Sequence, residues 1–208
     1  MKRYIFTVLI LSCLGGAATA QTEAQQELKA YMQEGLVNWE SPDKNFTFRI
    51  GGRVAIDGAH YLDDYTDRGS GVHFGEARVR MFSTIGRKLD IKFDVDLAPS
   101  RATLKDVYLR WHTNPYGFLK VGNFVEPFSA ENIQSTFDDH CISKSATIEA
   151  LGTGRTVGIS YRYYHKYFWG EGGVFSQKYN SETTKGDMGY GLSARLLGRW
   201  GNDDFNVH

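Results

Sequence analysis

Residues 75–97 alternate charged and apolar side chains, which limits this part of the chain to β-structure. In the segment GEARVRMFSTIGRKLDIKFDVDL, Glu76, Arg78 and Arg80 alternate with small or apolar residues, and after the turn-like IGRKLD the pattern resumes with Lys92 and Asp94. A repeat of two is that of a strand, whose side chains point alternately to opposite faces. The two runs predict an antiparallel hairpin with one wholly apolar face. Since a globular sandwich and a membrane barrel both contain such hairpins, other parts of the sequence must distinguish them.

The first twenty residues have the features of a secretory signal peptide. Lys2 and Arg3 precede an apolar run, and the small residues ATA close it at position 20. The apolar run is too short to cross a bilayer as a helix. We therefore expect residues 1–20 to be cleaved on export. The competing interpretation is a lipoprotein acylated at Cys13. It would require cleavage inside the apolar run and would not explain the small residues Ala18 and Ala20.

Charge and cysteine content exclude two classes of protein. The chain has 24 Lys plus Arg against 24 Asp plus Glu, and its cations are dispersed along strand-like segments, which argues against nucleic-acid binding. Outside the signal peptide Cys141 is the single cysteine, so an internal disulfide cannot form. No apolar run after residue 20 is long enough for a transmembrane helix, so a membrane form of this chain would cross as strands.

Eight strand-like segments follow a polar lead. Residues 21–45 are polar and helix-prone around residues 23–33, so we expect a short helical or disordered lead in the periplasm. The strand-like segments are FTFRIGGRVAIDGAHY, the two runs of residues 75–97, TLKDVYLRWH, GFLKVGNF, RTVGISYRYYH, the glycine-rich YFWGEGGVFSQ, and MGYGLSARLLGRW. Spacing and alternation predict an all-β chain.

The lengths of the connections favour a membrane barrel over a sandwich. The connections LDDYTDRGSG, residues 126–154 and KYNSETTKGD are long, IGRKLD, TNPYG and the link near His165 are short, and only APSRA departs from this alternation. Bacterial outer-membrane barrels have short periplasmic turns and long outer loops, whereas a sandwich has no reason to sort its loops. Aromatic residues such as Trp111, Tyr116 and Tyr167 also lie near strand ends, as in the girdles of barrels. The sequence therefore predicts that the dry face of the hairpin contacts lipid.

The segment LKDVYLRWHTNPYGFLKVGNFVEPFS, residues 104–129, resembles the phosphate-selective porin O and P family. Its strand, short turn, strand and loop start at Glu126, Pro127 and Phe128 follow the family's order, and the segments FRIGGRVAIDGAHY, EARVRMFSTIGRKLDIKFDVDLA and GTGRTVGISYRY add to the likeness. The resemblance covers nearly all of the chain after about Lys44. It implies a sixteen-stranded, trimeric outer-membrane channel for small hydrophilic solutes, with no enzymatic activity and no cofactor.

The same resemblance implies that a long loop folds into the lumen and narrows it. Residues 126–154 match that loop in position and length, and its polar tip would include Asp138, Asp139 and His140. In the family, lumenal Arg and Lys favour the passage of anions, including phosphate.

Charged residues on the polar face of the strands are the candidate pore-lining positions. A cation in lipid costs several kcal/mol, so charges confined to one face must face water. We expect the lumen to be lined by Arg49, Arg53, Asp57, Glu76, Arg78, Arg80, Lys92, Asp94, Asp96, Asp106, Tyr108, Arg110, Arg162, Arg195 and Arg199. Cations over a narrow pore favour anions. Alternatively, the cations and acids of neighbouring strands simply neutralise one another.

The number of strands leaves the full architecture open. Eight strands are half of the family barrel, and a closed eight-stranded barrel fills its interior with side chains. We therefore expect residues 46–208 to be the N-terminal half of a longer porin. Two alternatives are a secreted sandwich that binds carbohydrate or another protein, and a small eight-stranded membrane barrel that conducts little.

The sequence offers little sign of metal or catalytic chemistry. In DDHC, residues 138–141, adjacent side chains of an extended loop point apart and a second ligand pair is missing, so neither a zinc site nor a Cys–His site is expected. GTGRTVG lacks the Lys-Ser/Thr ending of a phosphate loop and leads into a strand. We expect a channel without enzymatic activity, metal or cofactor.

Overall fold

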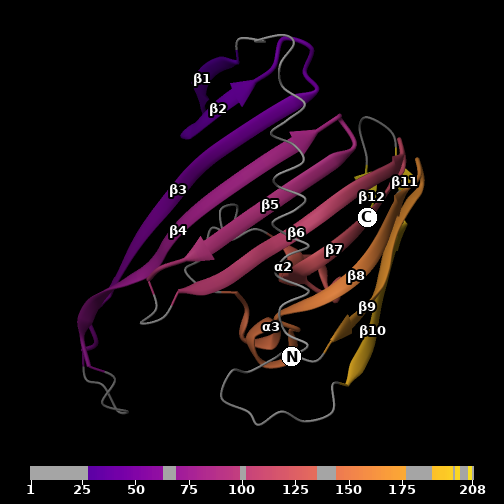
Figure 1. Ribbon diagram of the computed structural model, residues 1–208. Coiled ribbons are helices and arrows are strands. Elements are labelled where there is room, and N and C mark those ends of the chain that lie inside the picture. The colour runs from indigo at the N-terminus through magenta and orange to yellow at the C-terminus, as the bar shows by residue number, and fades with distance from the viewer. Residues whose placement is uncertain are drawn as a thin grey trace, which may run out of the picture.

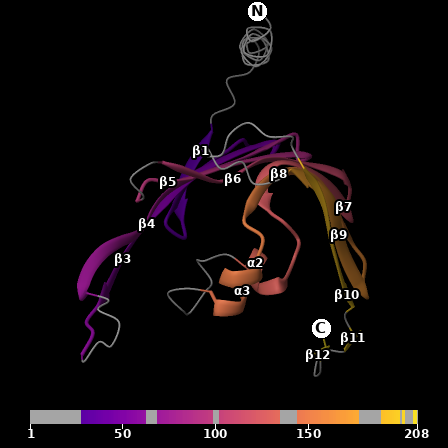
Figure 2. The same ribbon diagram turned by 90° about the horizontal axis from the view of Figure 1, so that it is seen from below.

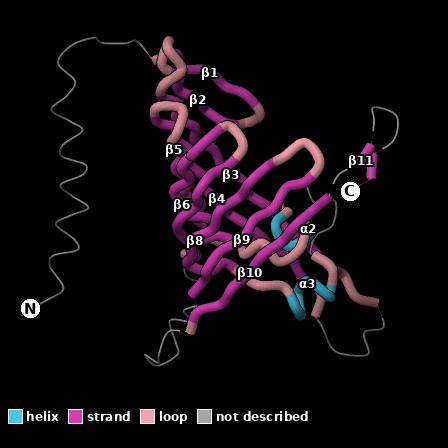
Figure 3. The backbone as a smooth tube through the Cα atoms, turned by 90° about the vertical axis from the view of Figure 1, so that its right-hand side faces the viewer, coloured by secondary structure: helices cyan, strands magenta, loops and turns pink. Residues whose placement is uncertain are grey.

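The described strands form one curved antiparallel sheet. The computed structural model describes residues 28–62, 69–98, 102–134, 144–176, 189–198, 200–201 and 206–207. Ten strands lie in the sheet in chain order, and a two-residue ladder stands apart from them (Figure 1). The sheet arches over two short helices, which lie on its concave side (Figures 2 and 3). Within the described residues, no helix has the length and apolar character needed to cross a membrane.

The strands of the sheet are β1 (Lys29–Gln33), β2 (Leu36–Glu40), β3 (Phe46–Ala59), β4 (Gly71–Ile85), β5 (Leu89–Asp96), β6 (Thr103–Asn114), β7 (Gly117–Val125), β8 (Arg155–Tyr164), β9 (Phe168–Ser176) and β10 (Tyr190–Gly198). The helices are α2 (Ala130–Ile133) and α3 (Ala146–Leu151), and the separate ladder joins β11 (Trp200–Gly201) to β12 (Asn206–Val207). All eight predicted segments are confirmed as β3 to β10. A sandwich would need two packed sheets, whereas these strands form one, whose outer strands β1 and β10 are each paired on one side in the described residues.

Two strands replace most of the helical or disordered lead that was predicted. β1 and β2 form a hairpin around Glu34 and Gly35, whose φ angles of 52° and 73° belong to a tight turn. β2 then pairs with the start of β3, and the Trp39 ring lies 5.5 Å from that of Phe48. The prediction was wrong for residues 29–40 because backbone pairing with the edge of β3 outweighs the weak helical preference of a short segment. Residues 21–27 lie outside the described residues.

One face of the sheet is apolar from its first strand to its last. The register connects one residue of every strand in a single row: Ala30, Trp39, Phe48, Ser83, Ile91, Leu109, Val121, Ile159, Val174 and Leu192. Ser83 alone is polar in this row. Leu192 is 86% exposed, and many other large apolar side chains of this face are also exposed to a lesser degree. An apolar surface of this extent is unusual for a protein in water and matches the lipid-facing wall of a barrel.

The opposite, concave face holds the few buried rings. Gly122 and Gly158 pair with each other in the middle of the sheet, and the missing side chains leave a hollow. The Phe124 and Phe175 rings fill it edge to face, 5.5 Å apart, and are 2% and 1% exposed. Gly122 has a φ of 140°, and a Cβ there would lie 2.3 Å from the Val107 carbonyl oxygen. The close approach of strands at this point therefore requires glycine.

Candidate functional site

The connection between β7 and β8 folds back beneath the concave face. Glu126, the first residue of the connection, accepts a hydrogen bond of 2.9 Å from the Thr156 hydroxyl of β8, and the next residue, Pro127, is fully buried. The Ser129 hydroxyl caps α2 by accepting from the Asn132 amide at 3.0 Å. The Asn132 side chain in turn donates to the Thr153 carbonyl at 2.9 Å. Both ends of the connection are thus held next to the first residues of β8.

A cluster of polar contacts fastens α2 to α3. The Lys144 ammonium donates to the Glu131 and Asn132 carbonyls of α2 at 2.8 and 2.7 Å. The Ser145 amide and hydroxyl donate to the Glu131 carboxylate at 2.7 and 3.0 Å. We call these residues, Glu131, Asn132, Lys144, Ser145 and Thr153, the α2–α3 clip.

The α2–α3 clip is expected to loosen in acid. The Ser145 amide, with its hydroxyl, holds the pKa of Glu131 below its usual range. The stabilisation is complete above the pH at which a free glutamate titrates, and it is lost as the pH falls through the lower value of the folded protein. A nitroxide on Thr147→Cys, in a Cys141→Ser background, should therefore become more mobile in strong acid. Glu131→Gln should make it mobile at every pH, whereas Glu149→Gln should leave the pH dependence unchanged; equal mobility in all three would contradict the role of Glu131.

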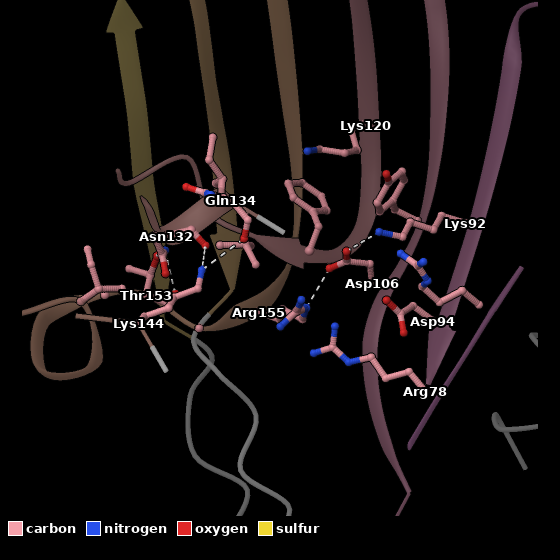
Figure 4. Close-up of a pocket in the computed structure, with 18 of the residues that line it drawn as sticks. Arg78, Lys92, Asp94, Asp106, Lys120, Asn132, Gln134, Lys144, Thr153 and Arg155 are labelled. Carbon is pink, nitrogen blue, oxygen red and sulfur yellow. Dashed lines mark hydrogen bonds and ion pairs between the residues drawn. The ribbon is translucent and has the colours of Figure 1, made fainter. Parts of the chain in front are cut away.

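A cavity of about 580 Å³ lies between the α2–α3 clip and the concave face (Figure 4). Its charged lining consists of seven cations and three acids: Arg78, Arg80, Lys92, Lys120, Lys144, Arg155 and Arg162, with Asp94, Asp106 and Glu149. Figure 4 shows Lys144 on the side of the clip and Asp106 on the side of the sheet. Tyr108, Asn132 and Gln134 add uncharged hydrogen-bonding groups. The lining is therefore polar, rich in donors and predominantly cationic.

Acids of the concave face neutralise several of these cations. Asp106 of β6 accepts from Lys92 of β5 at 2.6 Å and from Arg155 of β8 at 2.7 Å. Glu76 pairs with Arg53 and Arg78 at 3.2 and 3.1 Å. Cross-strand pairing and a cationic lining are therefore both present, and the two sequence-based interpretations do not exclude each other.

Glu171 of β9 is the centre of a second charge network. It is 3% exposed and accepts from Lys120 of β7 at 3.2 Å, from Arg162 Nε of β8 at 2.6 Å and from the Ser160 hydroxyl at 2.8 Å. A buried carboxylate with two cations and a hydroxyl is well compensated for the loss of water. This network ties three strands together beside the cavity.

The cavity brings together part of the predicted pore lining. The predicted residues that line it are Arg78, Arg80, Lys92, Asp94, Asp106, Tyr108 and Arg162. The others lie outside it: Arg49, Arg53 and Asp57 on β3, Glu76 on β4, Asp96 on β5, Arg110 on β6 and Arg195 on β10. Glu126 and Pro127 anchor the loop, whereas Phe128 is half exposed. Arg199, Asp138, Asp139 and His140 lie outside the described residues.

Sequence patterns missed three of the cavity's cations. Lys120 stands in GFLKVGNF, where apolar residues and glycine occupy both faces, so the alternation that marked other lumenal charges is absent. Lys144 lies in a connection with no strand period, and Arg155 is the first residue of β8. The strand period could have located Lys120. Residues two apart on a strand share a face, so Lys120 lies on the same concave side as Phe118 and Gly122. In the part of the chain that the structure describes, no group of three or more His, Cys, Asp or Glu could hold a metal.

The region that forms the sheet and the cavity matches a known family. The family model described as phosphate-selective porin O and P matches residues 48–198. The match begins at the third residue of β3 and ends with β10, so it includes the connection that carries α2 and α3. A comparison with curated proteins finds no match.

Proposed function

Because the chain belongs to the phosphate-selective porin O and P family, an outer-membrane porin family, we propose that it forms a passive channel that favours small hydrophilic anions. The observation that carries the preference for anions is the cationic lining of the cavity, with seven cations against three acids. Fixed positive charge beside a narrow aqueous path lowers the energy of an anion and raises that of a cation. The channel needs no catalytic group and no cofactor for this task.

The path of a solute follows from the same lining. An anion that enters between the α2–α3 clip and the concave face loses part of its hydration shell. Arg80 and Lys120 on the sheet, with Lys144 on the clip, offer replacement charge. Because Asp106 and Glu171 already neutralise part of the positive charge, binding stays weak enough for the solute to leave.

The proposal also covers the complete assembly. We infer that residues 1–20 are a cleaved signal peptide, that residues 46–208 are the N-terminal half of a sixteen-stranded barrel, and that the full barrel is a trimer. The single-sided pairing of β1 and β10 among the described strands supports further strands in the wall, because an open edge in lipid leaves backbone groups without partners. Phosphate as the preferred anion rests on the family alone.

Removing one lumenal cation tests the preference for anions. Lys92→Gln takes away a charge while Asp106 keeps Arg155 as its partner, so no acid is left unpaired. A unit charge about 6 Å from an ion in water is worth roughly 0.7 kcal/mol, with opposite sign for an anion and a cation, so the anion-to-cation permeability ratio should fall by about a factor of ten. The measurement is the reversal potential across a planar bilayer with a salt gradient, using protein extracted from outer membranes.

Lys166 supplies the matched control for this experiment. It lies in the tight turn between β8 and β9, outside the cavity, with its ammonium over the Tyr167 ring at 5.3 Å. Lys166→Gln should therefore leave the reversal potential unchanged. A channel that prefers cations, or a Lys92→Gln channel with unaltered selectivity, would contradict the proposed anion path.

A further inference from the structure

The hairpin of β1 and β2 carries the alternation of a barrel wall. Ala30 and Met32 of β1 lie in register with Trp39 and Val37 of β2, so all four side chains share one face. The other face of the hairpin presents Lys29, Tyr31 and Gln33 of β1 with Asn38 and Glu40 of β2. One face is thus entirely apolar and the other almost entirely polar, as in strands that separate lipid from water.

The apolar face of the hairpin is continuous with the apolar face of β3. Val37 pairs with Ile50 and Trp39 with Phe48, both on the apolar face of β3. Met32 is 75% exposed. Its apolar side chain would be more stable against lipid than in water. The hairpin precedes the region matched by the family, residues 48–198, so membership in the family says nothing about this surface.

Contacts at the base of the hairpin fix its position at one end of the sheet. The Gly86 amide donates to the Asn45 carbonyl at 2.7 Å, and the Arg87 guanidinium donates to the Asp43 carbonyl. These bonds join the segment after β2 to the tight turn between β4 and β5, at the end of the sheet where the short turns lie. Short turns mark the periplasmic side of outer-membrane barrels. The hairpin therefore lies at the level of the periplasmic membrane interface.

We propose that the β1–β2 hairpin extends the membrane wall of β3 to β10 at its periplasmic rim, with Ala30, Met32, Val37 and Trp39 against lipid. The proposal rests on the proposed function, since it needs the outward face of β3 to β10 to contact lipid. Continuity of register with that face identifies lipid as the partner. Trp39 suits this level because its ring is apolar and its N–H can reach the headgroups. The polar face of the hairpin then points to the aqueous side.

Nitroxide labels at adjacent residues test this proposal. Met32→Cys and Tyr31→Cys, each in the Cys141→Ser background, are labelled and reconstituted in phosphatidylcholine vesicles. Oxygen, which concentrates in lipid, and a water-soluble nickel chelate then compete as relaxation agents. The label at position 32 should respond several-fold more to oxygen, relative to nickel, than the label at position 31. Ala30→Cys and Lys29→Cys form a second pair if either of the first variants fails to fold.

A control pair on β3 separates failure of this inference from failure of the proposed function. Val54 is 66% exposed on the apolar face of β3, and Arg53 lies on the polar face, paired with Glu76. Alternation at positions 53 and 54 together with nickel access at both 31 and 32 would place the hairpin in water and overturn the inference alone. Absence of alternation at both pairs would overturn the membrane wall as well. An immobile label at position 32 that neither agent reaches would mean that protein covers this face, against the assignment to lipid.

Discussion

Replacement of Gly122 by alanine is expected to prevent normal folding of the sheet. Gly122 has a φ of 140°, which L-residues rarely adopt, and a Cβ there would lie 2.3 Å from the Val107 carbonyl oxygen and 2.6 Å from the Tyr108 Cα. Both obstacles are backbone, so no side-chain rotation can relieve them. Strain of this kind costs about 1–3 kcal/mol before any displacement of β6 is counted. Displacing β6 would also move Asp106 and Tyr108 away from the cavity.

Heat-modifiable gel mobility and urea unfolding in detergent measure the effect. Gly122→Ala should give little folded protein, or a clearly lower unfolding midpoint in the fraction that folds. Gly191→Ala is the matched control, since a Cβ at that position of β10 meets nothing within 4 Å. A Gly122→Ala protein with the unfolding midpoint of the parent would show that the strands can separate at this point without cost.

Glu171→Gln is expected to cause the second large loss. The carboxylate is 3% exposed and is shared by Lys120 and Arg162, whose charges would remain in place without a counter-ion. Breaking a buried ion pair by removing one partner costs about 3–5 kcal/mol, because an uncompensated charge stays buried. The same change removes one negative charge beside the cavity, so the net charge there rises by one unit. Any folded fraction should therefore be more selective for anions than the parent.

A double variant distinguishes this mechanism from a general loss of packing. Glu171→Gln with Lys120→Met removes both an acid and a cation, which leaves Arg162 with one fewer repulsive neighbour. It should recover part of the lost stability, because replacing both partners of a buried pair is less costly than removing one. Glu149→Gln, on an exposed position of α3, should change the urea midpoint little. If Glu171→Gln unfolds at the urea concentration of the parent, the three-strand network does not stabilise the wall.

The sequence-based predictions succeeded where one rule decided the structure. Strict alternation in β4, β5 and β6 assigned Arg78, Lys92 and Asp106 to the polar face, and the cavity includes all three. Their gathering at one cavity could not be predicted, because it depends on how the register stacks distant strands. Lys92 of β5 and Arg155 of β8 meet only through Asp106.

The failures have two physical causes. The segment of β1 and β2 contains residues that are common in helices, and its structure is decided by pairing with β3, a contact that local propensity does not describe. The α2–α3 clip depends on contacts between residues 131 and 145 and between 132 and 153, in a connection that has no repeating pattern. That such a loop folds inward was implied by the family resemblance, whereas no pattern in the sequence indicated the role of Lys144.

The order of the strands has a consequence for the speed of folding. Every strand of the sheet pairs with its neighbours in the chain, so most pairing steps close only a short turn. The longest connection is the one between β7 and β8, which carries residues 126–154. The entropy of closing a loop grows slowly with length, and this connection adds about 2 kcal/mol over a three-residue turn. The hydrogen bonds between Glu131 and Ser145 bring these two residues of the connection together, so fewer residues remain free when β8 pairs with β7. An early α2–α3 clip would therefore act as a folding aid, bringing β8 to β7 before the strands themselves have met.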